Sequence, residues 1–369
     1  MKKVLVFGMT ENPGGVESFL MNYYRNIDRT QLQFDFLCNS HNQVAYEDEL
    51  VKLGASVYHI TSRKENALKF RRELNSLFSE HAGDWDAIWV NVCSLANIDY
   101  LKIARRYGLR KRVIHSHNSE NMDSFLRGIL HKINMRRIEN YATDFWACSN
   151  EAAKWFYNDK LLRKVIVIQN AIDVDKMRFD PEKRKTIREQ LGVSDEVKVI
   201  GNVGRLHFQK NQEFILDVFS CYVKKQPESI LVLIGQGEDG EKLKAKSRDL
   251  GIDDKVIFAG LQRDIPAWLS ALDLFLFPSK FEGLSVAALE AQANGVPMLA
   301  SDRVISPDTK VNDNFVFYGL ENSPEMWSGK IDEVMSLERE KPEDISRRFS
   351  ERGFDIREEA VRLRELFDK

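Results

Sequence analysis

The chain has 369 residues, of which 43% are hydrophobic and 30% are charged, a globular rather than a disordered composition. This length is enough for two domains with sizeable hydrophobic cores. The formal net charge of -2 gives no reason to expect nucleic acid as a partner.

Short runs of β-branched and aromatic residues alternate with helical patterns along nearly the whole chain. The run that begins at Val4 is too short for a signal peptide, and it predicts a first strand. Apolar strands between helices are typical of parallel sheets covered on both faces, so two such series predict two doubly wound α/β units. The first series is predicted at residues 4–8, 34–38, 56–60, 87–91, 113–117, 144–149 and 165–169. The second is predicted at residues 197–203, 230–235, 256–260, 274–278 and 297–301.

The first pattern ends near residues 170–181, where a polar stretch begins. We therefore predict an N-terminal Rossmann-like domain at 1–170 and a C-terminal one at 171–354. A charged amphipathic helix at 355–369 is predicted to join the first domain. No run approaches the roughly 18 apolar residues of a membrane-spanning helix.

The four cysteines are too scattered for a zinc site or a disulfide framework, which predicts reduced, buried thiols and a cytoplasmic location. The first 170 residues are basic, with 24 Lys and Arg against 19 Asp and Glu. Their cations form either two solvated helix faces or a binding surface for an anionic membrane. In the second case, each cation near the membrane surface would contribute about 1 kcal/mol to binding. The two groups are Lys102, Arg105, Arg106, Arg110, Lys111 and Arg112, and then Arg127, Lys132, Arg136 and Arg137.

Ligands of doubly wound sheets bind where strands end and helices begin. In the first such loop, Gly14 and Gly15 would let the backbone approach an anion, although a tight turn would also need them. Neither the G-x-G-x-x-G fingerprint nor a P-loop occurs, which argues against a nicotinamide-dependent oxidoreductase. In the second half, Arg205 and Lys210 follow a strand and could bind a diphosphate. The alternative is that they are ordinary solvated surface residues.

The most specific pattern surrounds two acidic residues, Glu282 and Glu290. A strand ends before Glu282, Gly283 is predicted to make a turn, and a helix is predicted at 285–294. The backbone N–H groups of Leu284 and Ser285 could meet a phosphate, while the two carboxylates could accept hydrogen bonds from sugar hydroxyls. The alternatives are a helix-start charge for Glu282 and a surface ion pair for Glu290.

The Glu282-x7-Glu290 spacing, the loop with Arg205 and Lys210, and the Gly14-Gly15 loop together resemble family-4-type retaining glycosyltransferases of the GT-B fold. The resemblance covers almost the whole chain. It implies two Rossmann-like domains facing across a cleft, with the acceptor on the first and the nucleotide-sugar donor on the second. It implies neither a metal nor a cofactor.

The resemblance also implies roles for individual residues. Arg205 and Lys210 would hold the diphosphate, Glu282 the transferred sugar, and Glu290 the ribose. A backbone group near Gln262 would contact the base.

In the first domain, Gly15 would approach the diphosphate, and His117 rather than His115 would lie near the donor sugar. At residues 303–308 the sequence differs from the pattern of many family members. This segment is similar to that of enzymes of bacterial surface polysaccharide assembly. Two Asp-x-Asp sequences, at 84–86 and 173–175, are read as loop charge rather than metal ligands.

These features predict a metal-independent hexosyltransferase that retains the anomeric configuration. The expected donor is a UDP-sugar carrying a hexose or N-acetylhexosamine. The expected acceptor is a hydroxyl of a lipid-linked oligosaccharide in capsule or exopolysaccharide biosynthesis, reached in the cytoplasm or on the inner face of the cell membrane. The alternatives are a nucleotide-sugar isomerase or epimerase, a non-catalytic sensor of sugar nucleotides and, least favoured, an NAD-dependent oxidoreductase.

Overall fold

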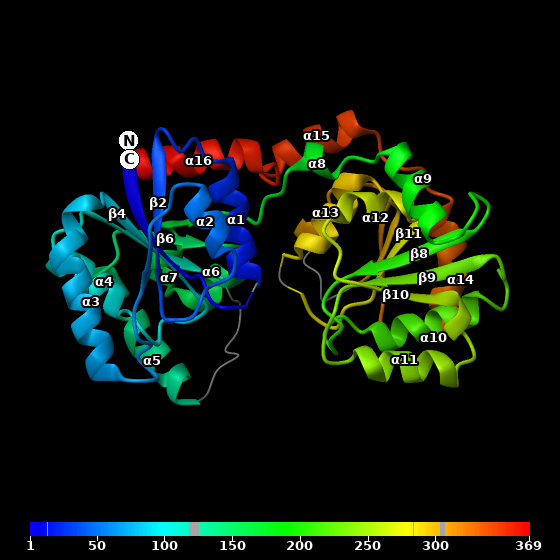
Figure 1. The fold of residues 1–369 in the computed structure, drawn as a ribbon, viewed down its shortest axis with the longest axis horizontal. Coiled ribbons are helices and arrows are strands. Elements are labelled where there is room, and N and C mark those ends of the chain that lie inside the picture. The colour runs from blue at the N-terminus through cyan, green and yellow to red at the C-terminus, as the bar shows by residue number, and fades with distance from the viewer. Residues whose placement is uncertain (13, 118–124, 283, 303–306) are drawn as a thin grey trace. The chain divides into compact units, whose positions relative to one another are not determined.

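The computed structural model describes residues 1–12, 14–117, 125–282, 284–302 and 307–369. These residues form two compact units (Figure 1). Unit 1 joins Met1–Ala171 to Ile356–Lys369, and unit 2 is Ile172–Asp355. The sequence prediction placed the two divides after residues 170 and 354.

Unit 1 is built on a seven-stranded parallel sheet with the order β3-β2-β1-β4-β5-β6-β7. The chain starts in the middle of this sheet, adds β2 and β3 on one side of β1, and then adds β4 to β7 on the other. The strands are β1 (Lys2–Phe7), β2 (Leu32–Cys38), β3 (Val57–His59), β4 (Ala87–Val92), β5 (Lys111–Ser116), β6 (Asp144–Ala147) and β7 (Val165–Val167). The helices are α1 (Gly15–Asn26), α2 (Glu47–Lys52), α3 (Ala67–His81), α4 (Asp99–Arg106), α5 (Phe125–Met135), α6 (Asn150–Phe156), α7 (Asp159–Leu162) and α16 (Ile356–Asp368).

Helices cover both faces of this sheet because successive side chains of a strand point to opposite faces. Val4 and Val6 of β1 pack in one core with α1 and α16, whereas Leu5 packs in another with α3 and α4. The C-terminal helix α16 therefore completes a core that begins with the first strand of the chain.

Unit 2 repeats this plan with a six-stranded parallel sheet in the order β10-β9-β8-β11-β12-β13. Its two cores also lie on opposite faces of the sheet. The strands are β8 (Lys198–Val203), β9 (Ser229–Ile234), β10 (Val256–Gly260), β11 (Leu274–Phe277), β12 (Met298–Ser301) and β13 (Phe315–Tyr318). The helices are α8 (Val174–Met177), α9 (Pro181–Gln190), α10 (Gln212–Tyr222), α11 (Gly240–Asp249), α12 (Ile265–Ala271), α13 (Val286–Asn294), α14 (Pro324–Met335) and α15 (Pro342–Glu351).

The predicted fold class, two doubly wound α/β units, is confirmed. The prediction omitted β13, a four-residue strand bounded by Asn314 and Gly319 that reads locally as a loop. The expectation of buried thiols holds for Cys38, but Cys148 and Cys221 are half-buried and Cys93 is exposed. None of the four cysteines forms a disulfide. No helix among the described residues is both long and apolar enough to cross a bilayer.

Candidate functional site

The strand order of unit 2 reverses between β8 and β11. The chain leaves β8 toward β9 on one side, and it returns later to add β11 on the other. Two loops therefore diverge at the carboxyl ends of these strands, where doubly wound sheets bind ligands. These are the loops at residues 204–211 and 278–285, which contain the predicted residues Arg205, Lys210 and Glu282.

Lys210 and Glu282 meet directly between the two loops. The ammonium of Lys210 lies 2.6 Å from Oε1 of Glu282, and only 16% and 6% of the two side chains are exposed. The same ammonium lies 5.2 Å from the centre of the Phe277 ring. An ammonium and a carboxylate are thus held together at the end of β11, largely shielded from water.

Backbone groups tie the same two loops together. The N–H of Lys280 donates to the carbonyl of Gln209 at 2.8 Å, and the side-chain amide of Gln209 donates to the carbonyl of Phe281 at 2.9 Å. The amide of Asn211 donates to the carbonyl of Pro278 at 3.0 Å. The Lys210–Glu282 pair therefore rests on a hydrogen-bonded frame rather than on two independent loops.

A third loop, which follows β9, packs against the loop at residues 204–211 through two glycines that sequence reasoning missed. Gly235 has a φ of +136°, and a Cβ there would overlap the carbonyl oxygen of Gly204. A Cβ on Gly237 would overlap the carbonyl of Leu206 in the same way. The signal was present in the sequence as a Gly-x-Gly directly after an apolar strand, a pattern that permits close backbone approach.

Arg205 differs from Lys210 in being open to solvent. Its side chain is 70% exposed, and its Nε donates to Glu238 Oε2 at 3.0 Å. An exposed ion pair contributes only about 0–1 kcal/mol to stability. The guanidinium can therefore exchange Glu238 for an anionic ligand at little cost.

Glu290 lies in helix α13, which begins one residue after Ser285. Ser285 occupies the N-cap position and its side chain makes no capping hydrogen bond. Burial raises the pKa of the half-buried Glu290 to about 7, and the charge of Lys176 on α8 opposes that shift. Gly283 and residues 303–306, which carry the predicted turn and the departure from the family pattern, lie outside the described residues.

Gln262 follows β10 at the same edge of the sheet, and its side-chain amide donates to the carbonyl of Ala259 at 2.5 Å. The loops after β8, β9, β10 and β11 thus share one edge. Lys210 and Glu282 are in contact, and Arg205 lies in the loop of Lys210. Among the described residues, Glu290 forms no hydrogen bond or ion pair with these three.

In unit 1, Gly14 and Gly15 lead into α1, whose residue Glu17 is buried. Oε1 of Glu17 accepts hydrogen bonds from the backbone N–H and the hydroxyl of Thr10. A Cβ on Gly14 would lie 2.9 Å from Glu17 Oε2, whereas a Cβ on Gly15 would meet open space. Glu17 thus fixes the loop at Gly14, whereas the space beside Gly15 is open.

The two histidines at the end of β5 have their rings 4.2 Å apart. Nε2 of His117 lies 2.8 Å from Oδ1 of Asn91, so Nε2 carries the proton and Nδ1 is an acceptor. Desolvation lowers the pKa of His117 to about 3 and that of His115 well below its usual value. His117 is therefore neutral near pH 7 and suited to hydrogen bonding rather than to charge neutralisation.

The two Asp-x-Asp sequences have structural roles. Asp173 caps α8 by accepting from the N–H of Lys176, and Asp86 accepts from the N–H of Lys3. Within the described ranges, no three His, Cys, Asp or Glu side chains gather as metal ligands.

Residues 183–352, most of unit 2, match the family of glycosyl transferases group 1. The chain carries a glycosyl transferases group 1 domain. The chain is 27% identical to the glycosyltransferase EpsF of Bacillus subtilis, over 100% of the chain and 96% of EpsF. It is 24% identical to the capsular polysaccharide biosynthesis glycosyltransferase CapH of Staphylococcus aureus, over 92% of each protein.

Solved structures share the fold of the whole chain. HepE of Anabaena in complex with UDP superposes with a TM-score of 0.79 over 100% of both chains, at 19% identity. WaaG, a glycosyltransferase involved in lipopolysaccharide biosynthesis, superposes with a TM-score of 0.72 over 99% of both chains, at 13% identity. The two doubly wound units are thus those of the GT-B glycosyltransferases.

Proposed function

We propose that this group 1 glycosyltransferase transfers a hexose or N-acetylhexosamine from a UDP-sugar to a hydroxyl of a lipid-linked oligosaccharide. The anomeric configuration is retained, and no metal takes part. The reaction belongs to capsule or exopolysaccharide biosynthesis and takes place at the cytoplasmic face of the cell membrane.

The similar proteins support the donor, the acceptor and the pathway in this proposal. HepE binds UDP and UDP-glucose in its crystal structures. A galactosyltransferase of Escherichia coli, 32% identical over 38% of this chain, is named for UDP-Gal as donor and GlcNAc-diphosphoundecaprenol as acceptor. CapH, which is named for capsular polysaccharide biosynthesis and matches over 92% of this chain, supports a role in polysaccharide assembly.

The observation that carries the proposal is the shielded Lys210–Glu282 pair beside the exposed Arg205 at the switch point of unit 2. A donor diphosphate would take Lys210 and Arg205 as counterions, because both cations follow β8, where such ligands bind. Glu282 would then accept hydrogen bonds from hydroxyls of the transferred sugar. Glu290 would hold the ribose, and the backbone near Gln262 the base.

The chemistry assigned to the protein is positioning and charge stabilisation. As the bond to the diphosphate breaks, Arg205, Lys210 and the N–H groups of Leu284 and Ser285 would stabilise the negative charge that develops on the leaving oxygen. That leaving group would take the proton of the acceptor hydroxyl on the same face, which retains configuration. His117 would accept a hydrogen bond from a sugar hydroxyl, and Gly15 would leave room for the diphosphate.

The deciding experiment combines binding with product analysis. Uridine, guanosine and adenosine diphosphates and their sugars are screened by thermal shift, and we expect a shift of several degrees with the uridine series. The matching UDP-sugar is then incubated with and without a membrane extract, and NMR assigns the anomeric configuration of the product. Inverted product would overturn the retaining mechanism, and conversion of the donor alone would reveal an isomerase.

A further inference from the structure

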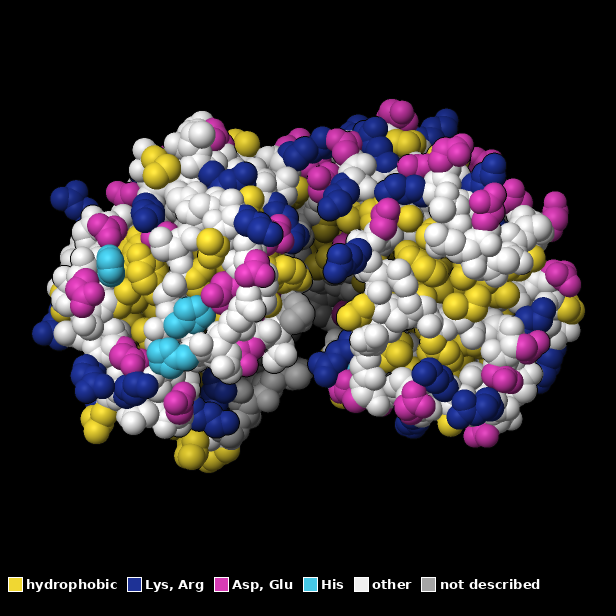
Figure 2. All heavy atoms as spheres, viewed as in Figure 1, with side chains coloured by type: hydrophobic (Ala, Val, Ile, Leu, Met, Phe, Trp, Pro, Cys, Tyr) yellow, Lys and Arg dark blue, Asp and Glu magenta, His cyan; other side chains and the backbone are white. Residues whose placement is uncertain are grey.

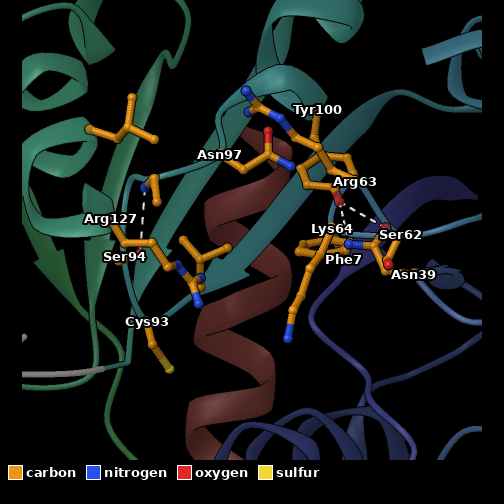
Figure 3. Close-up of a pocket in the computed structure, with 13 residues that line it drawn as sticks. Phe7, Asn39, Ser62, Arg63, Lys64, Cys93, Ser94, Asn97, Tyr100 and Arg127 are labelled. Atoms are coloured by element: carbon orange, nitrogen blue, oxygen red, sulfur yellow. Dashed lines mark hydrogen bonds between the residues drawn. The ribbon is translucent and has the colours of Figure 1, made fainter. Parts of the chain in front are cut away.

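Unit 1 has its own switch point, between β1 and β4, and a pocket opens there (Figure 3). Its volume is about 480 Å³, within the range of small-molecule sites. Phe7 ends β1, Asn39 follows β2, and Cys93 follows β4, so the pocket lies at the carboxyl edge of the sheet. Ligands bind at this position in doubly wound sheets.

The floor of the pocket is aromatic and its walls carry amides. The rings of Phe7 and Tyr100 stack with their centres 4.1 Å apart. The Tyr100 hydroxyl and the Asn39 amide exchange hydrogen bonds of 2.6 and 2.8 Å, which fixes both side chains. Asn97 and Ser62 add further polar groups. An apolar floor with fixed amides and hydroxyls suits a sugar ring.

The pocket also contains an excess of positive charge. Arg63, Lys64 and Arg127 line it, and among the residues that the structure describes no acidic side chain does. Arg63 pairs with Asp99 at 3.4 Å, whereas Lys64 makes no ion pair among the described residues. Lys64 and Arg127 reach into the pocket from opposite walls (Figure 3). Two cations facing one opening favour an anion, and a phosphate is the anion that such groups bind best.

Arg127 and Leu130 bring helix α5 to the edge of this pocket, and α5 has an unusual distribution of side chains. Its buried face holds His131, whose Nδ1 accepts from the N–H of Leu95, while the Asn134 amide donates to the Leu95 carbonyl. The large apolar residues are instead exposed to between 41% and 82%. They are Phe125, Leu126, Ile129, Leu130 and Ile133.

Figure 2 shows hydrophobic side chains exposed at the edge of unit 1 where α5 lies, with basic and acidic side chains near them. The basic residues Lys132, Arg136 and Arg137 are exposed on and after the same helix. An exposed apolar face beside cations is the pattern of a helix that lies at an anionic lipid interface. The basic group at residues 102–112 does not have this pattern. Arg105 and Arg112 donate to backbone carbonyls, and Lys111 pairs with Asp144.

We propose that this pocket binds the sugar-phosphate headgroup of the lipid-linked acceptor, and that the apolar face of α5 contacts its lipid chain. Lys64 and Arg127 would bind the phosphate, while Asn39, Asn97 and the Phe7–Tyr100 floor would hold the sugar. This inference rests on the proposed function for the existence of such an acceptor. It adds the site and the chemical class of ligand that the site selects, an anionic amphiphile rather than a neutral saccharide.

Direct binding tests the inference without requiring catalysis. The probes are N-acetylglucosaminyl diphosphate with a farnesyl chain, farnesyl N-acetylglucosaminide without phosphate, and N-acetylglucosamine 1-phosphate without a chain. We expect Lys64→Ala and Arg127→Ala each to weaken binding of the first probe about tenfold and to leave the phosphate-free probe unchanged. The matched control is Lys52→Ala, which removes an exposed cation of unit 1 away from the pocket.

A second pair of variants tests the apolar face. Leu126→Ser and Ile129→Ser should reduce binding of the farnesyl probes, and of vesicles made from equal parts phosphatidylcholine and phosphatidylglycerol, while N-acetylglucosamine 1-phosphate binds as before. UDP binding to unit 2 is measured in every variant. If the unmodified protein does not bind UDP, the proposed function is refuted. Intact UDP binding with equal affinity for phosphorylated and phosphate-free probes would overturn this inference alone.

Discussion

The ammonium of Lys210 lies 2.6 Å from a carboxylate oxygen of Glu282, although the two residues are 72 positions apart in the sequence. Each side chain shields the other from water, and the pair sits where the strand order of unit 2 reverses. A donor diphosphate that takes Lys210 as its counterion would leave Glu282 free to receive sugar hydroxyls. The contact therefore links binding of the diphosphate to preparation of the sugar site.

Removing either cation of this site should slow transfer. We expect Arg205→Ala and Lys210→Ala each to lower turnover by about 100-fold or more, because each would lose a group that stabilises the leaving diphosphate. Turnover is measured with saturating UDP-sugar and a membrane extract as acceptor. The control is Lys242→Ala, which removes another exposed cation of unit 2. Turnover near that of the unmodified enzyme in either variant would contradict the assignment.

The exposed Arg205–Glu238 pair and the shielded Lys210–Glu282 pair should differ in their contribution to stability. Arg205 is exposed, so Arg205→Ala should change the free energy of unfolding by less than about 1 kcal/mol. Glu282→Ala leaves the shielded ammonium of Lys210 unpaired and should cost about 3–5 kcal/mol. Combining Lys210→Met with Glu282→Ala should recover much of that loss. Urea unfolding of the single and double variants measures the coupling, and strictly additive effects would show that the contact is not energetically significant.

Glu290 should make donor binding depend on pH. Burial raises its pKa to about 7, so the carboxyl is protonated below that pH and ionised above it. In the proposed donor complex the ionised form would accept hydrogen bonds from the ribose hydroxyls, so affinity for UDP should rise as the pH increases through about 7. Glu290→Gln should remove this dependence, which separates it from the titration of UDP itself. Isothermal titration across this range provides the measurement, and identical pH profiles for the two proteins would refute the role.

The same raised pKa predicts an opposite trend for the ligand-free protein. The folded state holds the proton of Glu290 more tightly than the unfolded state, whose carboxyl has the ordinary pKa of 4.5. Stability should therefore fall as the pH rises from about 4.5 through 7 and then level off. Glu290→Gln should not show this fall, and thermal melts of the two proteins over this range test the difference.

The glycine contact between the loop after β8 and the loop after β9 should be sensitive to a single methyl group. Gly235→Ala would place a Cβ against the carbonyl of Gly204 at a backbone conformation that favours glycine, so we expect lower stability and loss of UDP binding. Gly329→Ala is the matched control, because its Cβ would meet open space within α14. Thermal shift with and without UDP gives both quantities. Undiminished UDP binding by Gly235→Ala would mean that this backbone contact does not support the site.

Metal independence is a prediction that dialysis can test. We expect turnover to persist after treatment with a chelator, since Arg205 and Lys210 are assigned the charge stabilisation that a divalent ion would otherwise supply. Loss of turnover that magnesium or manganese restores would overturn this part of the proposal.

The fold could be predicted because its strands are continuous apolar runs between helices, and because the loops that follow strands are few. Lys210 and Glu282 were each identified as candidates, but their direct contact could not be, since it depends on how two loops meet. The pocket of unit 1 was missed entirely, because Phe7, Asn39 and Lys64 come from separate segments of the chain and share no motif. The apolar residues of α5 read as an ordinary core stripe, and sequence periodicity does not reveal whether another element covers it.

Helix α16 supplies Ile356, Leu363 and Phe367 to the same core as Val4 of the first strand. Unit 1 is therefore discontinuous, and a ribosome completes the whole of unit 2 before it delivers the last piece of unit 1. Unit 2 has all of its strands available earlier, and can reach its native state while the first 171 residues still lack their final helix. During synthesis, unit 1 would be the one that waits with apolar surface uncovered, and chaperones would be expected to engage it first.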